Sequence, residues 1–362
     1  MFSSPLLPVD RTRLPPRLRA WVGGNLSGPP KGLVRKRWSA GIFQLDRLGD
    51  FVLAISAIRV VLEKWGEASC LLVVSEAAAP LAAREFPGVE RIVLPTSAPS
   101  LMRNLVPIAL RHRARFRGHE FDRVVCLSHH RELYKETALS WLRTAQRYQL
   151  DHTTFPREAS LPWCLELVAH RQLAAAAVGR EVELDEIKPR LASVAATAGT
   201  TLVVCPFAQE SARSLPVPII VTALEHYRRK SAAPIVISAD ATATAATAAL
   251  ATALRSRGIG GAIEASNDTF EQFLRRIATA GAVFAVDSAP AHIATALDKP
   301  MVLVPGGGRF GLSSPWQSST RQRIIENRVP CYGCGWRCYQ PEPYCLTGLD
   351  PAGIAAALPL LA

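Results

Sequence analysis

The sequence contains no apolar run long enough to cross a bilayer. Its longest weakly hydrophobic piece, Ala241 to Leu254, falls short of the roughly 20 residues that a spanning helix needs. The N-terminus also lacks the continuous apolar segment of a secretory signal, because four prolines interrupt it: Pro5, Pro8, Pro15 and Pro16. These absences favour a cytoplasmic protein, in which paired disulfides are not expected.

Acidic residues are nearly absent from two stretches, and these stretches account for the net charge of +12. Residues 1–37 hold eight lysines and arginines against one acid, Asp10, and residues 103–117 hold five arginines and no acid. Such patches indicate a polyanionic partner: a phosphorylated lipid, an anionic membrane surface or nucleic acid. They would also suit an ordinary solvated surface.

The composition suits a large core and two domains, since 49% of the 362 residues are hydrophobic and 20% are charged. Short aliphatic runs alternate with helix-length segments, which predicts α/β domains with parallel, doubly wound sheets. A proline-containing segment near residues 180–200 separates two sets of strands. The predicted strands are Ala40–Leu45, Cys70–Val74, Arg91–Leu94, Arg123–Leu127, Thr201–Cys205, Ile235–Ser238, Ala282–Val286 and Met301–Val304.

The stretch "FQLDRLGDFVLAISAIRVVLEKW", from Phe43 to Trp65, reads as a strand, a sharp turn and an apolar helix. Asp50 stands where the helix begins. The positive end of the helix dipole favours a carboxylate there as the anion, at the strand-end edge where ligands of such sheets bind. Taken alone, this aspartate is also explained as a helix cap.

In "AVDSAPAHIATA" a buried strand ends at Asp287 and a helix follows at once, with His292 just inside it. The N–H groups at positions 288 and 289 precede the first turn, a geometry that binds phosphate or diphosphate. The later "PGGGRFG" would let the backbone approach a ligand closely. In the alternative interpretation, Asp287 and Ser288 only cap the helix and His292 is a satisfied surface residue.

Another loop, "CPFAQESARSLP", leaves a buried strand and contains Gln209, Ser211 and Arg213. It lies at the same predicted sheet edge, so Arg213 could reach the same anion, although loop arginines are often simply solvated.

Three motifs in order resemble the heptosyltransferase family, glycosyltransferase family nine, over about residues 39–330. They are "LDRLGDFVLAISAIRVVLEKW", "GHEFDRVVCLSHHRELYKETALSWLRTAQRYQLD" and "ASNDTFEQFLRRIATAGAVFAVDSAPAHIATALDKP". The family transfers sugars from nucleotide diphosphates to bacterial cell-surface glycolipids. The resemblance implies a GT-B fold, in which two Rossmann-like domains face a central cleft, and an inverting transfer that requires no cofactor.

Carried over to this chain, the resemblance makes Asp50 the general base that takes the proton of the acceptor hydroxyl. Seven residues would bind the donor: Gln209, Ser211, Arg213, Asp287, Ser288, Ala289 and His292. The acceptor would meet Arg111, Arg113, His129 and His130. The chain departs from the family at Arg213, where lysine is frequent, and at Ala289, where glycine is common; after Ser238 it offers only Asp240 as an acid.

The resulting organisation is a basic, proline-rich extension (1–38), an acceptor domain (39–185), a donor domain (186–330), a cysteine-rich knuckle (331–346) and a C-terminal helix (347–362). The expected activity moves a heptose-like sugar from a nucleotide diphosphate to an anionic glycolipid or glycan in lipopolysaccharide biosynthesis. The expected location is the cytoplasm, with peripheral contact at the cytoplasmic face of the inner membrane.

Four of the eight cysteines fall within fifteen residues: Cys331, Cys334, Cys338 and Cys345. In a cytoplasmic protein, such a set suits a structural tetrahedral thiolate site for zinc or iron, and some relatives in the family carry similar tails. The alternative is reduced or adventitiously paired thiols. The other four, Cys70, Cys126, Cys164 and Cys205, stand in apolar contexts and are expected in the core.

Two other functions remain open at this point. One is a non-catalytic GT-B relative that only binds nucleotide. The other is a basic nucleic-acid-binding protein with a four-cysteine knuckle. The basic runs lack interleaved aromatics, and the cysteine segment contains one basic residue, Arg337. Both features weigh against nucleic acid.

Overall fold

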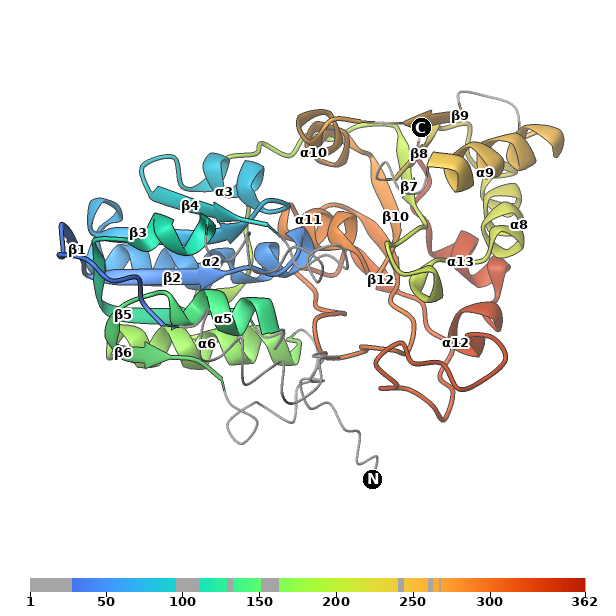
Figure 1. The fold of residues 1–362 in the computed structure, drawn as a ribbon. Helices are drawn as coiled ribbons and strands as arrows, with labels where there is room; N and C mark the ends of the chain where they lie inside the picture. The colour runs from blue at the N-terminus through green and yellow to red at the C-terminus, as the bar shows by residue number, and fades with distance from the viewer. Residues whose placement is uncertain are drawn as a thin grey trace. The chain divides into compact units, whose positions relative to one another are not determined.

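The computed structural model describes residues 28–95, 111–128, 133–150, 163–239, 244–259, 263–266 and 268–361. These residues form two compact units (Figure 1). The N-terminal unit contains the described residues up to 150 together with 166–189. The C-terminal unit contains residues 163–165 and the described residues from 190 onward. Among the described residues, no helix combines the length and the apolar character needed to span a bilayer.

The N-terminal unit is built on a six-stranded sheet in which every strand pair is parallel. The order is β1-β5-β2-β3-β4, and β6 pairs with β5. The strands are β1 (Lys36–Trp38), β2 (Ala40–Gln44), β3 (Cys70–Ser75), β4 (Glu90–Leu94), β5 (His119–Cys126) and β6 (Thr144–Tyr148). The helices are α2 (Leu48–Trp65), α3 (Ala79–Glu85), α5 (Leu133–Ser140), α6 (Leu165–Val178) and α7 (Leu184–Ile187), with the 3₁₀ turns η1 (Glu67–Ser69) and η2 (Ala114–Phe116).

The C-terminal unit has a second parallel six-stranded sheet, in the order β12-β11-β10-β7-β8-β9. Its strands are β7 (Leu202–Cys205), β8 (Ile235–Ser238), β9 (Ile263–Ser266), β10 (Ala282–Val286), β11 (Met301–Val304) and β12 (Gln322–Ile324). Its helices are α8 (Val217–Arg228), α9 (Thr244–Ser256), α10 (Phe270–Thr279), α11 (Ala289–Ala296), α12 (Tyr344–Thr347) and α13 (Pro351–Ala357), with the turn η3 (Ser211–Arg213). Counted along the chain, this is the 3-2-1-4-5-6 strand order of a dinucleotide-binding sheet.

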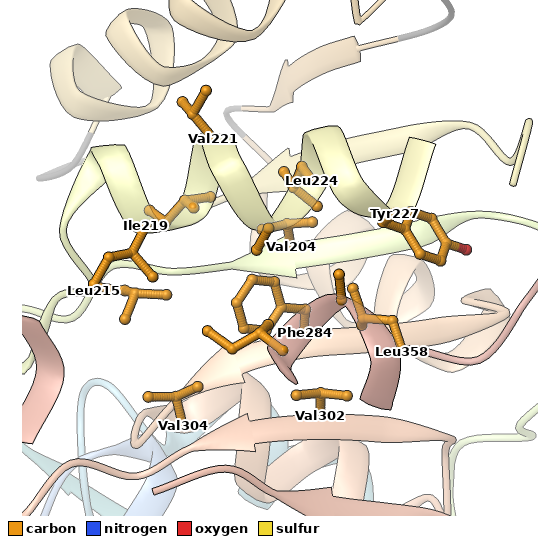
Figure 2. Close-up of a cluster of buried hydrophobic side chains, with 14 of the residues drawn as sticks. Val204, Leu215, Ile219, Val221, Leu224, Tyr227, Phe284, Val302, Val304 and Leu358 are labelled. Carbon is orange, nitrogen blue, oxygen red and sulfur yellow. The ribbon is translucent and has the colours of Figure 1, made fainter. Parts of the chain in front are cut away.

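Side chains from adjacent strands and from the helices on one face form the core of the C-terminal unit. Val204, Phe284 and Val302 come from β7, β10 and β11, and they pack beneath Leu224 of α8 (Figure 2). Leu358, directly after α13, closes the same cluster. The last helix of the chain is therefore part of this core.

All eight strands expected from sequence are present, and the sheets are parallel as predicted. The predicted α/β class, with a parallel sheet in each of two units, is confirmed. Four further strands, β1, β6, β9 and β12, are short and have few aliphatic residues, so they carry no aliphatic run to indicate them. Thr269 caps α10 and forms a capping box with Gln272.

Candidate active site

Asp50 is the third residue of α2, and it closes a capping box rather than occupying the cap position. Its Oδ2 accepts the backbone N–H of Arg47, the N-cap residue, at 3.2 Å. Its side chain is half-buried. The helix N-terminus favours the charged carboxylate here, and α2 begins just beyond the carboxyl end of β2.

Polar contacts between β2 and β5 hold the turn that precedes α2. The N–H of Leu45 donates to Ser128 Oγ at 2.7 Å, and the N–H of Asp46 donates to Gln44 Oε1 at 2.7 Å. Strand order reverses between β2 and β5, since β3 and β4 lie on one side and β6 on the other. Ligands of open parallel sheets bind at such a reversal, which is where Asp50 stands.

A buried ion pair supports this turn and was not anticipated from the sequence. Asp46, the residue two positions beyond β2, pairs with Lys135 of α5, and their side chains are 0% and 6% exposed. The carbonyl of Asp46 also accepts the hydroxyl of Ser75 at 2.7 Å. Asp46 is part of the quoted motif "LDRLGD", but no pattern in the sequence predicts that it pairs with Lys135, 89 positions later.

The expected acceptor residues are only partly described. His129 and His130 lie outside the described residues, as does Asp240 on the donor side. Arg111 is exposed. Arg113 is half-buried and donates to two backbone carbonyls, those of Gly28 at 2.9 Å and Pro29 at 3.1 Å. An acceptor role for these four residues stays a prediction.

In the C-terminal unit, the order of the strands brings Arg213 to Asp287. β7 and β10 are neighbours at the point where strand order reverses, and both residues follow the carboxyl ends of these strands. Arg213 donates from Nη2 to the backbone carbonyl of Asp287, 74 residues away. Its Nε and the Oδ1 of Asp287 are buried and make no hydrogen bond to any described residue. Such unsatisfied polar atoms indicate a place for a polar ligand.

His292 of α11 is buried, which contradicts the alternative of a surface residue. The indole N–H of Trp316 donates to its Nδ1 at 3.0 Å, and both side chains are nearly inaccessible. This bond assigns the ring proton to Nε2, which lies 3.7 Å from Asp287 Oδ1. Trp316 therefore presents His292 as a donor on the Asp287 side. No sequence pattern pointed to this tryptophan.

The other expected donor residues lie at the start of α11 and on the loop after β7. Ser288 is the N-cap of α11, but its hydroxyl donates to the carbonyl of Val286 at 3.1 Å, and Ala289 begins the helix. Gln209 and Ser211 are exposed on the loop after β7. The hydroxyl of Ser214, which sequence reasoning did not select, accepts the N–H of Ala208 at 3.0 Å and holds this loop.

The glycine-rich loop after β11, expected to approach a ligand, approaches side chains of its own chain. Aromatic rings of the cysteine-rich segment lie against its backbone: Tyr332 covers Gly307, and Trp336 covers Gly306 and Gly308. A Cβ on Gly307 would come within 2.6 Å of the Tyr332 ring. The glycines therefore make room for the chain's own aromatic side chains, and a contact between this loop and a ligand stays a prediction.

The same segment is bonded to the loop through its backbone. The N–H of Gly333 donates to Gly307 and that of Gly335 to Gly308, each at 2.8 Å. The cysteine-rich segment is therefore attached to the loop that leads along the chain to Trp316, the hydrogen-bond partner of His292.

The four clustered thiols differ in exposure but interact with one another. Cys345 is buried, Cys331 and Cys334 are half-buried, and Cys338 is exposed. Although Cys338 is largely exposed, partial desolvation raises the pKa of its thiol, and the neighbouring thiols Cys334, Cys345 and Cys331 raise it further. Within the described ranges, no three histidine, cysteine or acidic side chains converge closely enough to hold a metal ion.

Comparison with known proteins supports the family resemblance. Residues 224–335 match the model of glycosyltransferase family 9 (heptosyltransferase). No curated protein matches the sequence.

Several solved structures share the fold. ADP-heptose LPS heptosyltransferase II of E. coli is 16% identical, with 88% of this chain and 97% of that chain covered and a TM-score of 0.61. E. coli heptosyltransferase WaaC with ADP-2-deoxy-2-fluoro heptose is 16% identical, with 86% of this chain and 98% of that chain covered and a TM-score of 0.55. The iron-containing dodecameric glycosyltransferase TibC of enterotoxigenic E. coli H10407 is 15% identical, with 90% of this chain and 77% of that chain covered and a TM-score of 0.51. The resemblance drawn from the motifs is therefore confirmed: the chain has a GT-B fold, and its residues 224–335 match the model of glycosyltransferase family 9, the heptosyltransferase family.

Proposed function

We propose that this glycosyltransferase moves a heptose-like sugar, with inversion, from a nucleotide diphosphate to a glycolipid or glycan of the bacterial cell surface, as in lipopolysaccharide biosynthesis. The observation that carries the proposal is the group formed by Arg213, Asp287 and His292 at the strand reversal beside the N-terminus of α11. In the N-terminal unit, Asp50 stands at the corresponding reversal of strand order, between β2 and β5. A glycolipid acceptor would bring the enzyme to the cytoplasmic face of the inner membrane.

The donor is proposed to be an ADP-sugar, because the similar E. coli heptosyltransferases are named for, or hold, ADP-heptose or its analogue. Three features of this chain suit a leaving diphosphate. The N–H groups of Ser288 and Ala289 precede the first hydrogen bond of α11, which Ala291 makes to the carbonyl of Ser288; Arg213 carries a permanent charge, and His292 offers Nε2–H. Together they can stabilise the departing charge without a metal ion.

Asp50 is proposed as the base that accepts the proton of the acceptor hydroxyl while the sugar leaves the diphosphate. The capping-box bond from Arg47 fixes the orientation of the carboxylate, and the helix dipole keeps it charged. Such a base acts efficiently only when the hydroxyl is held against it, which is the task of the acceptor site.

Removal of the phosphate-binding side chains should weaken ADP binding selectively. We expect Arg213→Ala and His292→Ala each to raise the Kd of ADP about tenfold or more, because a hydrogen bond to a charged group contributes roughly 1.5–3 kcal/mol. The Kd of adenosine should change much less. Calorimetric titration of both ligands measures the difference.

Arg229→Ala is the matched control, since this exposed arginine at the end of α8 lies away from the strand reversal. Equal losses for ADP and adenosine in the Arg213 and His292 variants would show that neither side chain contacts phosphate.

A structural metal ion is proposed to join the four clustered cysteines, whose side chains would have to move closer together than they lie in this structure. The neighbouring cysteines raise the pKa values of Cys338 and Cys345, because thiolates placed this close together would repel one another. A bound cation would attract these thiolates and offset the repulsion. The fold relative TibC is described as iron-containing. The metal would stabilise the segment that packs on the glycine loop, with no part in the transfer itself.

Protein purified without chelator should contain about one zinc or iron ion per chain, and Cys334→Ser or Cys338→Ser should lose it. Elemental analysis checks this expectation. Cys205→Ala is the control, because burial raises the pKa of that thiol to about 12 and keeps it neutral. Metal-free native protein with four freely titratable thiols would contradict the proposal.

The alternative of a nucleotide-binding relative without activity rests on Ala289 and Arg213, where the chain departs from the family. It predicts ADP binding with neither transfer nor slow hydrolysis of an ADP-sugar. Incubation of the intact chain with ADP-heptose separates the two functions.

A further inference from the structure

Two basic stretches that are far apart in the sequence form one surface on the N-terminal unit. The N–H groups of Arg35 and Lys36 donate to the carbonyl of Gly118 at 2.7 and 3.0 Å. A Cβ on Gly32 would lie 3.2 Å from Cγ of Arg117, so the Arg117 side chain runs against this glycine. The segment 28–36 therefore lies beside the start of β5, and its cations add to those of residues 111–117.

Hydrogen bonds from the body of the unit fix this segment in place. Arg113 donates to the carbonyls of Gly28 and Pro29, and Arg143 donates to Pro30 at 3.2 Å. The N–H of Gly28 donates to Ser140 Oγ at 2.9 Å. The segment is thus anchored at both ends, and its central residues form a defined projection.

An aliphatic side chain stands on this projection. Leu33 is 88% exposed, the highest value among the large hydrophobic residues that the structure describes, and Val34 is 43% exposed. Lys31, Arg35 and Arg117 are exposed around them and make no ion pair with any described residue. By contrast, Lys36 and Arg37 are paired with Glu90 and Asp122 at 2.6 Å.

We infer that this surface, defined by Lys31, Leu33, Val34, Arg35 and Arg117, docks the N-terminal unit on an anionic lipid bilayer. The three cations would contact lipid phosphates, while Leu33 and Val34 enter the boundary between headgroups and acyl chains. The exposed aliphatic residues of this surface, Leu33 and Val34, favour lipid over nucleic acid, since proteins that bind single-stranded nucleic acid use aromatic rings for stacking on the bases.

The docking surface is distinct from the site that holds Asp50. It lies at the amino-terminal ends of β1 and β5, whereas Asp50 follows the carboxyl end of β2. The path from Lys36 to Gln44 along β1 and β2 spans about 26 Å at ~3.3 Å per residue. The contact therefore attaches the protein to the surface and requires neither donor nor acceptor. It deepens the membrane-face part of the proposed function, but its test is independent of sugar transfer.

The test is sedimentation of the intact chain with vesicles of phosphatidylcholine alone or of phosphatidylcholine mixed with phosphatidylglycerol, without sugar donor. Binding is expected only to the anionic vesicles and should weaken with salt. The triple variant Lys31→Ala/Arg35→Ala/Arg117→Ala should bind about a hundredfold more weakly, from roughly fivefold per charge. Leu33→Ser should lower binding severalfold.

Two matched variants control the test. Leu360→Ser removes another exposed leucine, 66% exposed in the C-terminal unit, and should bind like the parent. Arg229→Ala removes an exposed arginine outside the surface. Equal binding to both vesicle types, parent-like binding by the triple variant or by Leu33→Ser, or tighter binding to single-stranded RNA than to anionic vesicles would each overturn the inference.

Discussion

Replacement of Asp50 by asparagine is expected to lower the rate of sugar transfer by at least about a hundredfold, the usual range for loss of a general base. Asparagine keeps a side-chain oxygen that can accept the N–H of Arg47, so the first turn of α2 should stay intact. It cannot take a proton from the acceptor hydroxyl. Folding and ADP affinity should therefore remain close to those of the parent.

The rate with ADP-heptose and a glycolipid acceptor measures the loss, and calorimetry with ADP verifies the donor site. Glu63→Gln provides the matched control, because this exposed carboxylate lies near the other end of the same helix. Near-normal turnover in Asp50→Asn would contradict the proposed role as a base. It would leave Asp50 only its part in the capping box, through the hydrogen bond from Arg47.

Lys135→Met is expected to destabilise the N-terminal unit by about 3–5 kcal/mol, because it removes the ammonium group that pairs with the buried Asp46 carboxylate. The side chain of Asp46 is 0% exposed, so water cannot replace the lost ammonium group. Denaturant unfolding should show an early transition for this unit, with later unfolding of the C-terminal unit.

The double variant Asp46→Asn/Lys135→Met should recover part of the stability, since it removes both charges. Lys64→Met removes an exposed lysine from α2 in the same unit and should shift the transition by no more than about 0.5 kcal/mol. An unchanged transition in Lys135→Met would mean that the pair contributes nothing to this unit.

The positions of Asp50, Asp287 and His292 at sheet edges were predictable from sequence. Each stands directly after, or a few residues after, a short aliphatic run that ends where a helical pattern begins, and this boundary is a local property of the chain. The expectation that Arg213 could share a ligand with Asp287 followed from parallel sheets, whose strand ends meet at one edge.

The buried strands, the parallel α/β class and the residues at the carboxyl ends of the strands were predictable, because apolar periodicity is a property of consecutive residues. Which of these strand ends are neighbours, and which side chains support them, depends on contacts between residues far apart in the chain. Trp316 meets His292, Lys135 meets Asp46, and Trp336 covers the glycine loop, although no pattern in the sequence links them. These contacts depend on strand order and on side-chain packing, which bring together residues that are distant in the chain.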